Sequence, residues 1–204
     1  MNTTWQNCCR EIPRVSRLTL HAPDALQRAA YPERWAALPH GPNGVQQQMN
    51  IQKVIQSQYL SALAMLKQAI VKCPRAMWDA PQDQDQFWFK AYHALYYAHL
   101  YLQATRQDFV RWRKHSKPVS SAPLSKEEVL EYLAFVEQEV ARRVPVTDLE
   151  AESGFHGFHM DKLELQFVNI RHLQQHTGEL YERLGARRNI QLDWAEHRHR
   201  EKKG

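Results

Sequence analysis

Residues 164–180 read ELQFVNIRHLQQHTGEL, a stretch in which core-type positions recur at helical spacing. The stripe is nearly continuous and consists of Leu165, Val168, His172, His176 and Leu180. This pattern predicts a long amphipathic helix from about His159 to Leu184, with Gly185 as its natural stop. Because the stripe should face the core, both histidines are expected there, and buried imidazoles need partners.

Three more helices are predicted upstream, over residues 51–70, 86–103 and 126–143. The last of these begins with a capping box, in which Ser125 and Glu128 each satisfy a free backbone N–H at the helix start. No segment shows the alternating pattern of a strand. The sequence therefore predicts an all-α fold, a four-helix bundle whose inward side chains can converge on one site.

The domain organisation follows from proline content and charge. Residues 1–44 hold five prolines and no sustained periodicity, so they are expected to form an irregular N-terminal arm. The bundle is assigned to residues 45–195, and residues 196–204 form a basic tail. Met49 stands just before the first helix, and we hypothesise that a shorter native product begins there. N-terminal sequencing that finds Met1 intact in the natural protein would remove this hypothesis.

Composition limits the class of protein. A chain of 204 residues with 43% apolar content is long enough for one domain with a substantial core. No window approaches the roughly 18 apolar residues of a membrane span, and the N-terminus lacks a secretory signal. A cytoplasmic protein without membrane association is therefore expected. Its odd count of three cysteines gives no reason to expect a disulfide framework.

The net charge of +5 raises the question of nucleic-acid binding. Much of the excess lies near the C-terminus, in Arg187, Arg188 and the run over residues 197–203. Such terminal runs are typical of solvated tails. The chain also lacks helix-turn-helix, zinc-finger and RNA-binding signatures. Nucleic acid is therefore a disfavoured partner.

The histidines are the candidates for chemistry. His172 and His176 lie four residues apart on one helix face, within reach of a single ion. A third ligand must come from another helix, where His93 and His99 are the candidates. Only one of these two can face the site, and periodicity alone does not select it.

Three neutral imidazoles with a fourth position left open describe a catalytic type of Zn²⁺ or related site. The ion in such a site lowers the pKa of bound water or holds a substrate thiolate. On residue physics alone, ordinary buried or surface histidines remain the alternative interpretation.

The stretch over residues 164–180 resembles the last-helix signature of the DinB/YfiT-like superfamily. Tyr92-His93 with Leu100-Tyr101-Leu102 looks like its first ligand helix, and Leu192-Asp193-Trp194 looks like its characteristic close. The resemblance covers about residues 49–195 and implies an up-down-down-up four-helix bundle. It also implies that His93, His172 and His176 form a metal triad for Zn²⁺ or Ni²⁺, which selects His93 over His99.

The chain departs from this pattern at three positions. Thr177 and Glu179 stand where many members carry arginine and glutamine, and Gln175 replaces a frequent histidine. Any role that those family side chains play near the metal is therefore in doubt here.

Several other residues are candidates for a role at the site. Asn169 and Glu179 flank the histidine pair by about one turn, where either can orient a ligand imidazole or act on substrate protons. Tyr96 is the tyrosine to test for contact with the pocket. Arg171 lies off the apolar stripe, which favours a surface role. His156 and His159 belong to a loop with two glycines, in a repeated Gly-Phe-His pattern. This pattern favours a surface turn over a mobile lid or a second metal site.

The resemblance implies a divalent-metal-dependent enzyme that transfers or uses a low-molecular-weight thiol and acts on a small-molecule substrate. One alternative is a metal-dependent hydrolase. Another is a metal-binding stress-response protein without catalytic activity, because a fold does not determine a function. Bundles of this kind often pair through an apolar helix face, so a homodimer is also expected.

Overall fold

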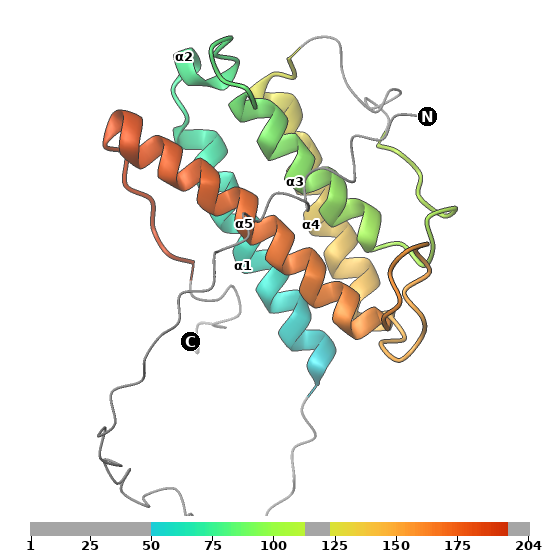
Figure 1. Ribbon diagram of the computed structural model, residues 1–204. Helices are drawn as coiled ribbons and strands as arrows, with labels where there is room; N and C mark the ends of the chain where they lie inside the picture. The colour runs from blue at the N-terminus through green and yellow to red at the C-terminus, as the bar shows by residue number, and fades with distance from the viewer. Residues whose placement is uncertain (1–49, 113–122, 196–204) are drawn as a thin grey trace, which may run out of the picture. The chain divides into compact units, whose positions relative to one another are not determined.

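The computed structural model describes residues 50–112 and 123–195 (Figure 1). The predicted arm over residues 1–44, the proposed start at Met49 and the basic tail over residues 196–204 lie outside these ranges. The described residues form helices and connecting segments without a β-strand. The helices are α1 (Ile51–Lys72), α2 (Arg75–Trp78), α3 (Phe87–Tyr101), α4 (Lys126–Arg143), the 3₁₀ turn η1 (Val144–Val146) and α5 (Lys162–Arg188). The prediction of an all-α fold is confirmed for these residues.

The predicted helix ends are confirmed in α4 and wrong in α5. Ser125 and Glu128 form the expected capping box at the start of α4. In α5, Gly185 does not end the helix, which continues to Arg188 and stops at Asn189 in the left-handed conformation with φ 52°. A glycine inside a helix costs only about 1 kcal/mol. Past the glycine, Arg187 pairs with Asp83, and the N–H of Ile190 donates to the carbonyl oxygen of Leu184 at the helix end.

The four long helices contact one another in a ring, in which α1 and α3 each pack against both α4 and α5 (Figure 1). Their directions follow from pairs of residues in contact. The hydroxyl of Tyr59 in α1 donates to Oε1 of Gln166 near the start of α5, over 2.8 Å. That of Tyr181, late in α5, donates to the carbonyl oxygen of Met65, over 3.0 Å. Helices α1 and α5 therefore run parallel.

The other two helices run in the opposite direction. Lys90 at the start of α3 contacts Glu179 in the second half of α5, so these two helices are antiparallel. Lys126 at the start of α4 donates to the carbonyl oxygen of Cys73, which follows α1, so α1 and α4 are antiparallel as well. Along the chain, the helix directions are thus up, down, down and up.

The core between the helices consists of large apolar side chains at helical spacing. Full burial of each such side chain contributes about 1.5–3 kcal/mol. The largest fully buried residues are Tyr59, Tyr132, Phe87, Ile55, Leu63, Leu66, Ile70, Leu95, Leu100, Leu133, Leu165 and Leu173. Within the described ranges, no helix is both long enough and apolar enough to cross a bilayer.

A buried lysine ties the end of α3 to the start of α5. Lys162 is 6% exposed, and its ammonium donates to the carbonyl oxygens of Gln103, Ala104 and Ser153. A buried ammonium is stable only when its protons are paired in this way. The contact therefore fixes α5 against α3, the two helices that carry the histidines.

We predict a difference between two glycines in the loop before α5. Gly154 and Gly157 have φ angles of +75° and +90°, but an added Cβ at Gly154 alone would overlap a backbone atom, the carbonyl oxygen of Ala104. Gly157→Ala should lower the free energy of unfolding by about 1–2 kcal/mol through backbone strain alone. Gly154→Ala should cost at least about 1 kcal/mol more, because of the clash. Urea denaturation followed by circular dichroism measures both, and equal costs would contradict the prediction.

Candidate metal site

Three histidines from two helices converge between α3 and α5. His93 comes from α3, and His172 and His176 come from α5. One ring nitrogen of each lies within 4.8 Å of the other two. The ring of His93 is 5.3 Å from that of His172 and 4.9 Å from that of His176, between centroids. The antiparallel packing of α3 on α5 is what brings His93 to the pair.

His99 lies on a different face of α3. Its Nδ1 is 3.2 Å from the hydroxyl of Tyr132 in α4, and its ring packs on Phe109 and Phe135. Six residues separate His93 from His99, which places the two side chains on different sides of the helix. The ring of His93 faces α5, and the ring of His99 faces α4. Of the two candidates that periodicity left open, the structure thus brings His93 to the histidine pair.

The spacing of the ring nitrogens fits a shared ion. With Zn–N lengths of about 2.0–2.1 Å, tetrahedral ligand nitrogens lie about 3.3 Å apart. Nε2 of His172 and Nε2 of His176 are already 3.1 Å apart. Nδ1 of His172 is buried without a hydrogen-bond partner among the described residues. A neutral imidazole keeps one unprotonated ring nitrogen, so His172 with its proton on Nδ1 can offer Nε2, and the three residues could bind one divalent ion.

Burial keeps two of the rings neutral. Burial and the neighbouring His176 lower the pKa of His93 to about 4, and burial with both other histidines lowers that of His172 to about 3. A neutral imidazole carries the free lone pair that a metal needs, whereas a protonated one does not. Both rings are thus in the ligating state at neutral pH.

Glu179 supports His176 from the side opposite the triad. Its Oε2 lies 3.0 Å from Nδ1 of His176 and 2.6 Å from Nζ of Lys90. Burial opposes ionisation of Glu179, but the hydrogen bonds from Lys90 and His176 outweigh it and lower its pKa to about 2. A carboxylate only accepts hydrogen bonds, so it holds the proton of His176 on Nδ1 and leaves Nε2 free for the ion.

Aromatic side chains cover the rest of the triad. The ring of Tyr97 lies 4.7 Å from that of His93 and 5.3 Å from that of His172, in both cases edge to face. Tyr96, the tyrosine singled out from the sequence, packs on Tyr97 and Phe109 instead. Tyr97 is therefore the tyrosine that contacts two of the candidate ligands.

Two of the remaining sequence candidates donate to backbone carbonyl oxygens rather than to the histidine rings. Asn169 is fully buried and donates to the carbonyl oxygen of Ala98. Thr177 bonds back to the carbonyl oxygen of Leu173 in its own helix. Arg171 is exposed at the surface of α5. Of Thr177 and Glu179, it is thus Glu179 that contacts a candidate ligand, His176.

The two histidines of the loop before α5, His156 and His159, are exposed and line a cavity of about 500 Å³. A second cavity, of about 480 Å³, lies between α3 and α4 beside His99 and Glu139. Neither cavity is lined by His93, His172 or His176.

The helical period places Tyr97 on the His93 face of α3, but Tyr96 was favoured over it from the sequence. Lys90 was not a candidate, although it lies on the same face, three residues before His93. The contact of Lys90 with Glu179 spans 89 residues of sequence, and only the pairing of the helices creates it.

No protein-family model matches the chain, and no curated protein or solved structure matches it either.

We predict that metal binding requires His93 but not His99, the other histidine of α3. The parent protein should retain about one Zn²⁺ or Ni²⁺ per chain after gel filtration, and His93→Gln and His172→Gln should each weaken binding at least about tenfold. His99→Gln is the matched control and should retain the metal, because its ring faces α4. Mass spectrometry of metal content measures all four proteins. Loss of metal in the His99 variant, with the His93 variant unaffected, would overturn the assignment.

Proposed function

We propose that this protein is a divalent-metal-dependent enzyme of the DinB/YfiT-like type. In this proposal, His93, His172 and His176 hold Zn²⁺ or Ni²⁺, and the open coordination position receives a low-molecular-weight thiol that is transferred to, or used on, a small-molecule substrate. The observation that carries the proposal is the approach of three ring nitrogens from two antiparallel helices to within 4.8 Å of one another.

The arrangement of the helices supports the proposed type. The resemblance implies directions of up, down, down and up, and the contacts of α1, α3, α4 and α5 have that order. It also implies one ligand from the second long helix and two from the last, and His93, His172 and His176 follow that distribution. The short helix α2 and the turn η1 are additions to this plan.

The charges around the site support an anionic ligand. When bound, the ion acts as a Lewis acid that lowers the pKa of a thiol or a water in its open position. The three imidazoles contribute no negative charge, and the ammonium of Lys90 balances the carboxylate of Glu179. The double positive charge of the ion would thus be uncompensated by the protein, which favours a thiolate over a neutral ligand.

The residues around the triad have distinct roles in this proposal. Glu179 orients His176 and is held by two donors, so it acts as a positioning residue rather than as a free base. The ring of Tyr97 covers His93 and His172 and excludes water from their buried edges. The thiol chemistry itself is proposed from the family resemblance and the donor set.

We predict that a cobalt-substituted form will report thiol binding. Addition of a small thiol to the Co²⁺-loaded protein should produce a sulfur-to-cobalt charge-transfer band, because the thiolate enters the coordination sphere. The S-methylated form of the same compound is the matched control and should give no band, since a thioether has no proton to lose. Absorption spectroscopy in the near ultraviolet measures both.

Two results would contradict the thiol proposal. If the protein binds Co²⁺ but gives no band with several thiols, a hydrolytic or non-enzymatic metal-binding role is favoured instead. If the protein binds no divalent ion at all, the enzyme proposal fails as a whole. If the band does appear, thiol-dependent turnover with a panel of electrophilic substrates distinguishes an enzyme from a binding protein.

A further inference from the structure

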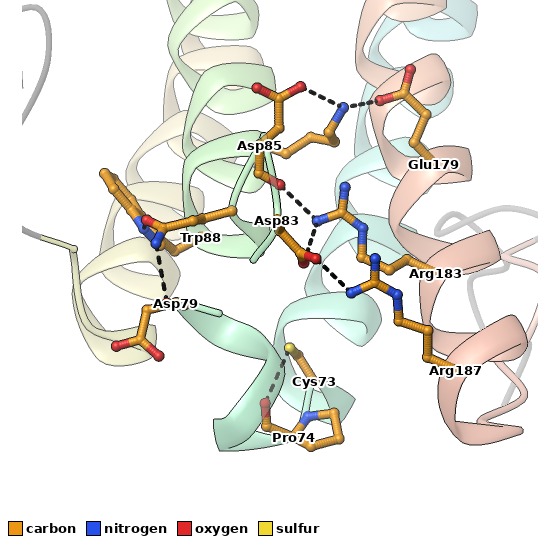
Figure 2. Close-up of polar contacts among 11 residues, drawn as sticks. Cys73, Pro74, Asp79, Asp83, Asp85, Trp88, Glu179, Arg183 and Arg187 are labelled. Carbon is orange, nitrogen blue, oxygen red and sulfur yellow. Dashed lines mark hydrogen bonds and ion pairs between the residues drawn. The ribbon is translucent and has the colours of Figure 1, made fainter. Parts of the chain in front are cut away.

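Lys90 connects the candidate metal site to the segment that precedes α3. Its ammonium lies 2.6 Å from Oε2 of Glu179 and 3.5 Å from Oδ2 of Asp85. Figure 2 shows Asp85 and Glu179 joined by dashed lines to the same nitrogen between them. The side chain of Lys90 is only 14% exposed, so these two carboxylates are its main electrostatic partners at this point of the fold.

One oxygen of Glu179 serves both neighbours. Oε2 accepts from Lys90 and also lies 3.0 Å from Nδ1 of His176. Without the lysine, the Glu179 side chain, which is 37% exposed, would be free to rotate toward water. The imidazole of His176 would then lose the acceptor that keeps its proton on Nδ1.

Asp85 is itself held in place from α5. Nη1 of Arg183 donates to the carbonyl oxygen of Asp85 over 2.7 Å, and its distance to Oδ2 of Asp83 is 3.3 Å. Arg187, one turn further on, donates to Oδ1 of Asp83 over 2.7 Å. Asp83 has a side chain only 3% exposed, so both arginines hold a buried carboxylate (Figure 2). The segment before α3 is thus anchored on the same helix that carries Glu179.

We propose that Lys90 is a positioning residue of the three-histidine site, which through Glu179 maintains the tautomer of His176 that presents Nε2 to the ion. The inference rests on the proposed metal-binding function and extends it to a residue outside the triad. Asp85 contacts Lys90 from the other side, over 3.5 Å. Outer contacts of this kind change metal affinity by about 10–100-fold in other proteins.

The test uses two measurements on the full chain. ¹⁵N NMR of the metal-free protein gives the tautomer of His176. Competition with a chromophoric chelator gives the Zn²⁺ affinity. Lys90→Met should give a mixture of tautomers and about tenfold weaker Zn²⁺ binding. Lys90→Arg should restore both properties, because a guanidinium can still donate to Glu179. Arg187→Met is the matched control, because it removes an ion pair of the same network without touching Glu179.

The outcomes separate positioning from general stabilisation. A changed tautomer and weaker Zn²⁺ binding in Lys90→Met, with Arg187→Met unchanged, supports the inference. Unchanged tautomer and affinity within twofold in Lys90→Met overturns it, as do equal losses in both variants. If Lys90→Met does not fold, Asp85→Asn should show a smaller change in the same direction. If the parent binds no Zn²⁺, the proposed function fails, and the tautomer of His176 alone decides whether Lys90 positions it.

Discussion

The antiparallel packing of α3 on α5 is the constraint on which the rest of the site depends. At one end of this pair, Lys162 binds the carbonyl oxygens that follow α3 and precede α5. At the other end, Arg183 and Arg187 of α5 hold Asp83 before α3. A shift of one helix by a single turn would move a ligand by about 5.4 Å and break the triad. Polar contacts at both ends thus set the register between the helices that the apolar core alone would leave less specific.

The site shows how a helical core accommodates many ionisable groups. The three imidazoles are close together, and burial keeps His93 and His172 neutral, so the cluster does not repel itself. At the edge of the cluster, Glu179 carries a charge that Lys90 balances at 2.6 Å. Removing one partner of such a pair leaves a charge without compensation, which is why the pair acts as a unit.

The polar residues around the histidine pair also fit together in physical terms. Glu179 introduces a negative charge, and a lysine on the facing helix compensates for it. Thr177 needs no external partner, because its hydroxyl bonds to Leu173 within α5. Gln175 reaches Oε1 of Glu179 over 3.4 Å and so adds a weak contact to the same carboxylate. The polar side chains next to the pair are therefore held by partners from α3 and α5 themselves.

The sequence by itself determined the helical class, the four long helices and the face of α5 that carries His172 and His176. These features depend on local periodicity and capping, such as the Ser125–Glu128 box, which neighbouring residues decide. The end of α5 was predicted wrongly at Gly185, because the contact of Arg187 with Asp83, which lies past the glycine, is a tertiary contact. Periodicity could not choose between His93 and His99; the family resemblance favoured His93, and His93 is the one that lies beside the pair. Only the tertiary structure decided that Lys90 contacts Glu179 and that Tyr97, not Tyr96, contacts the triad. The physical reason is that packing between distant segments sets the register and the rotation of each helix.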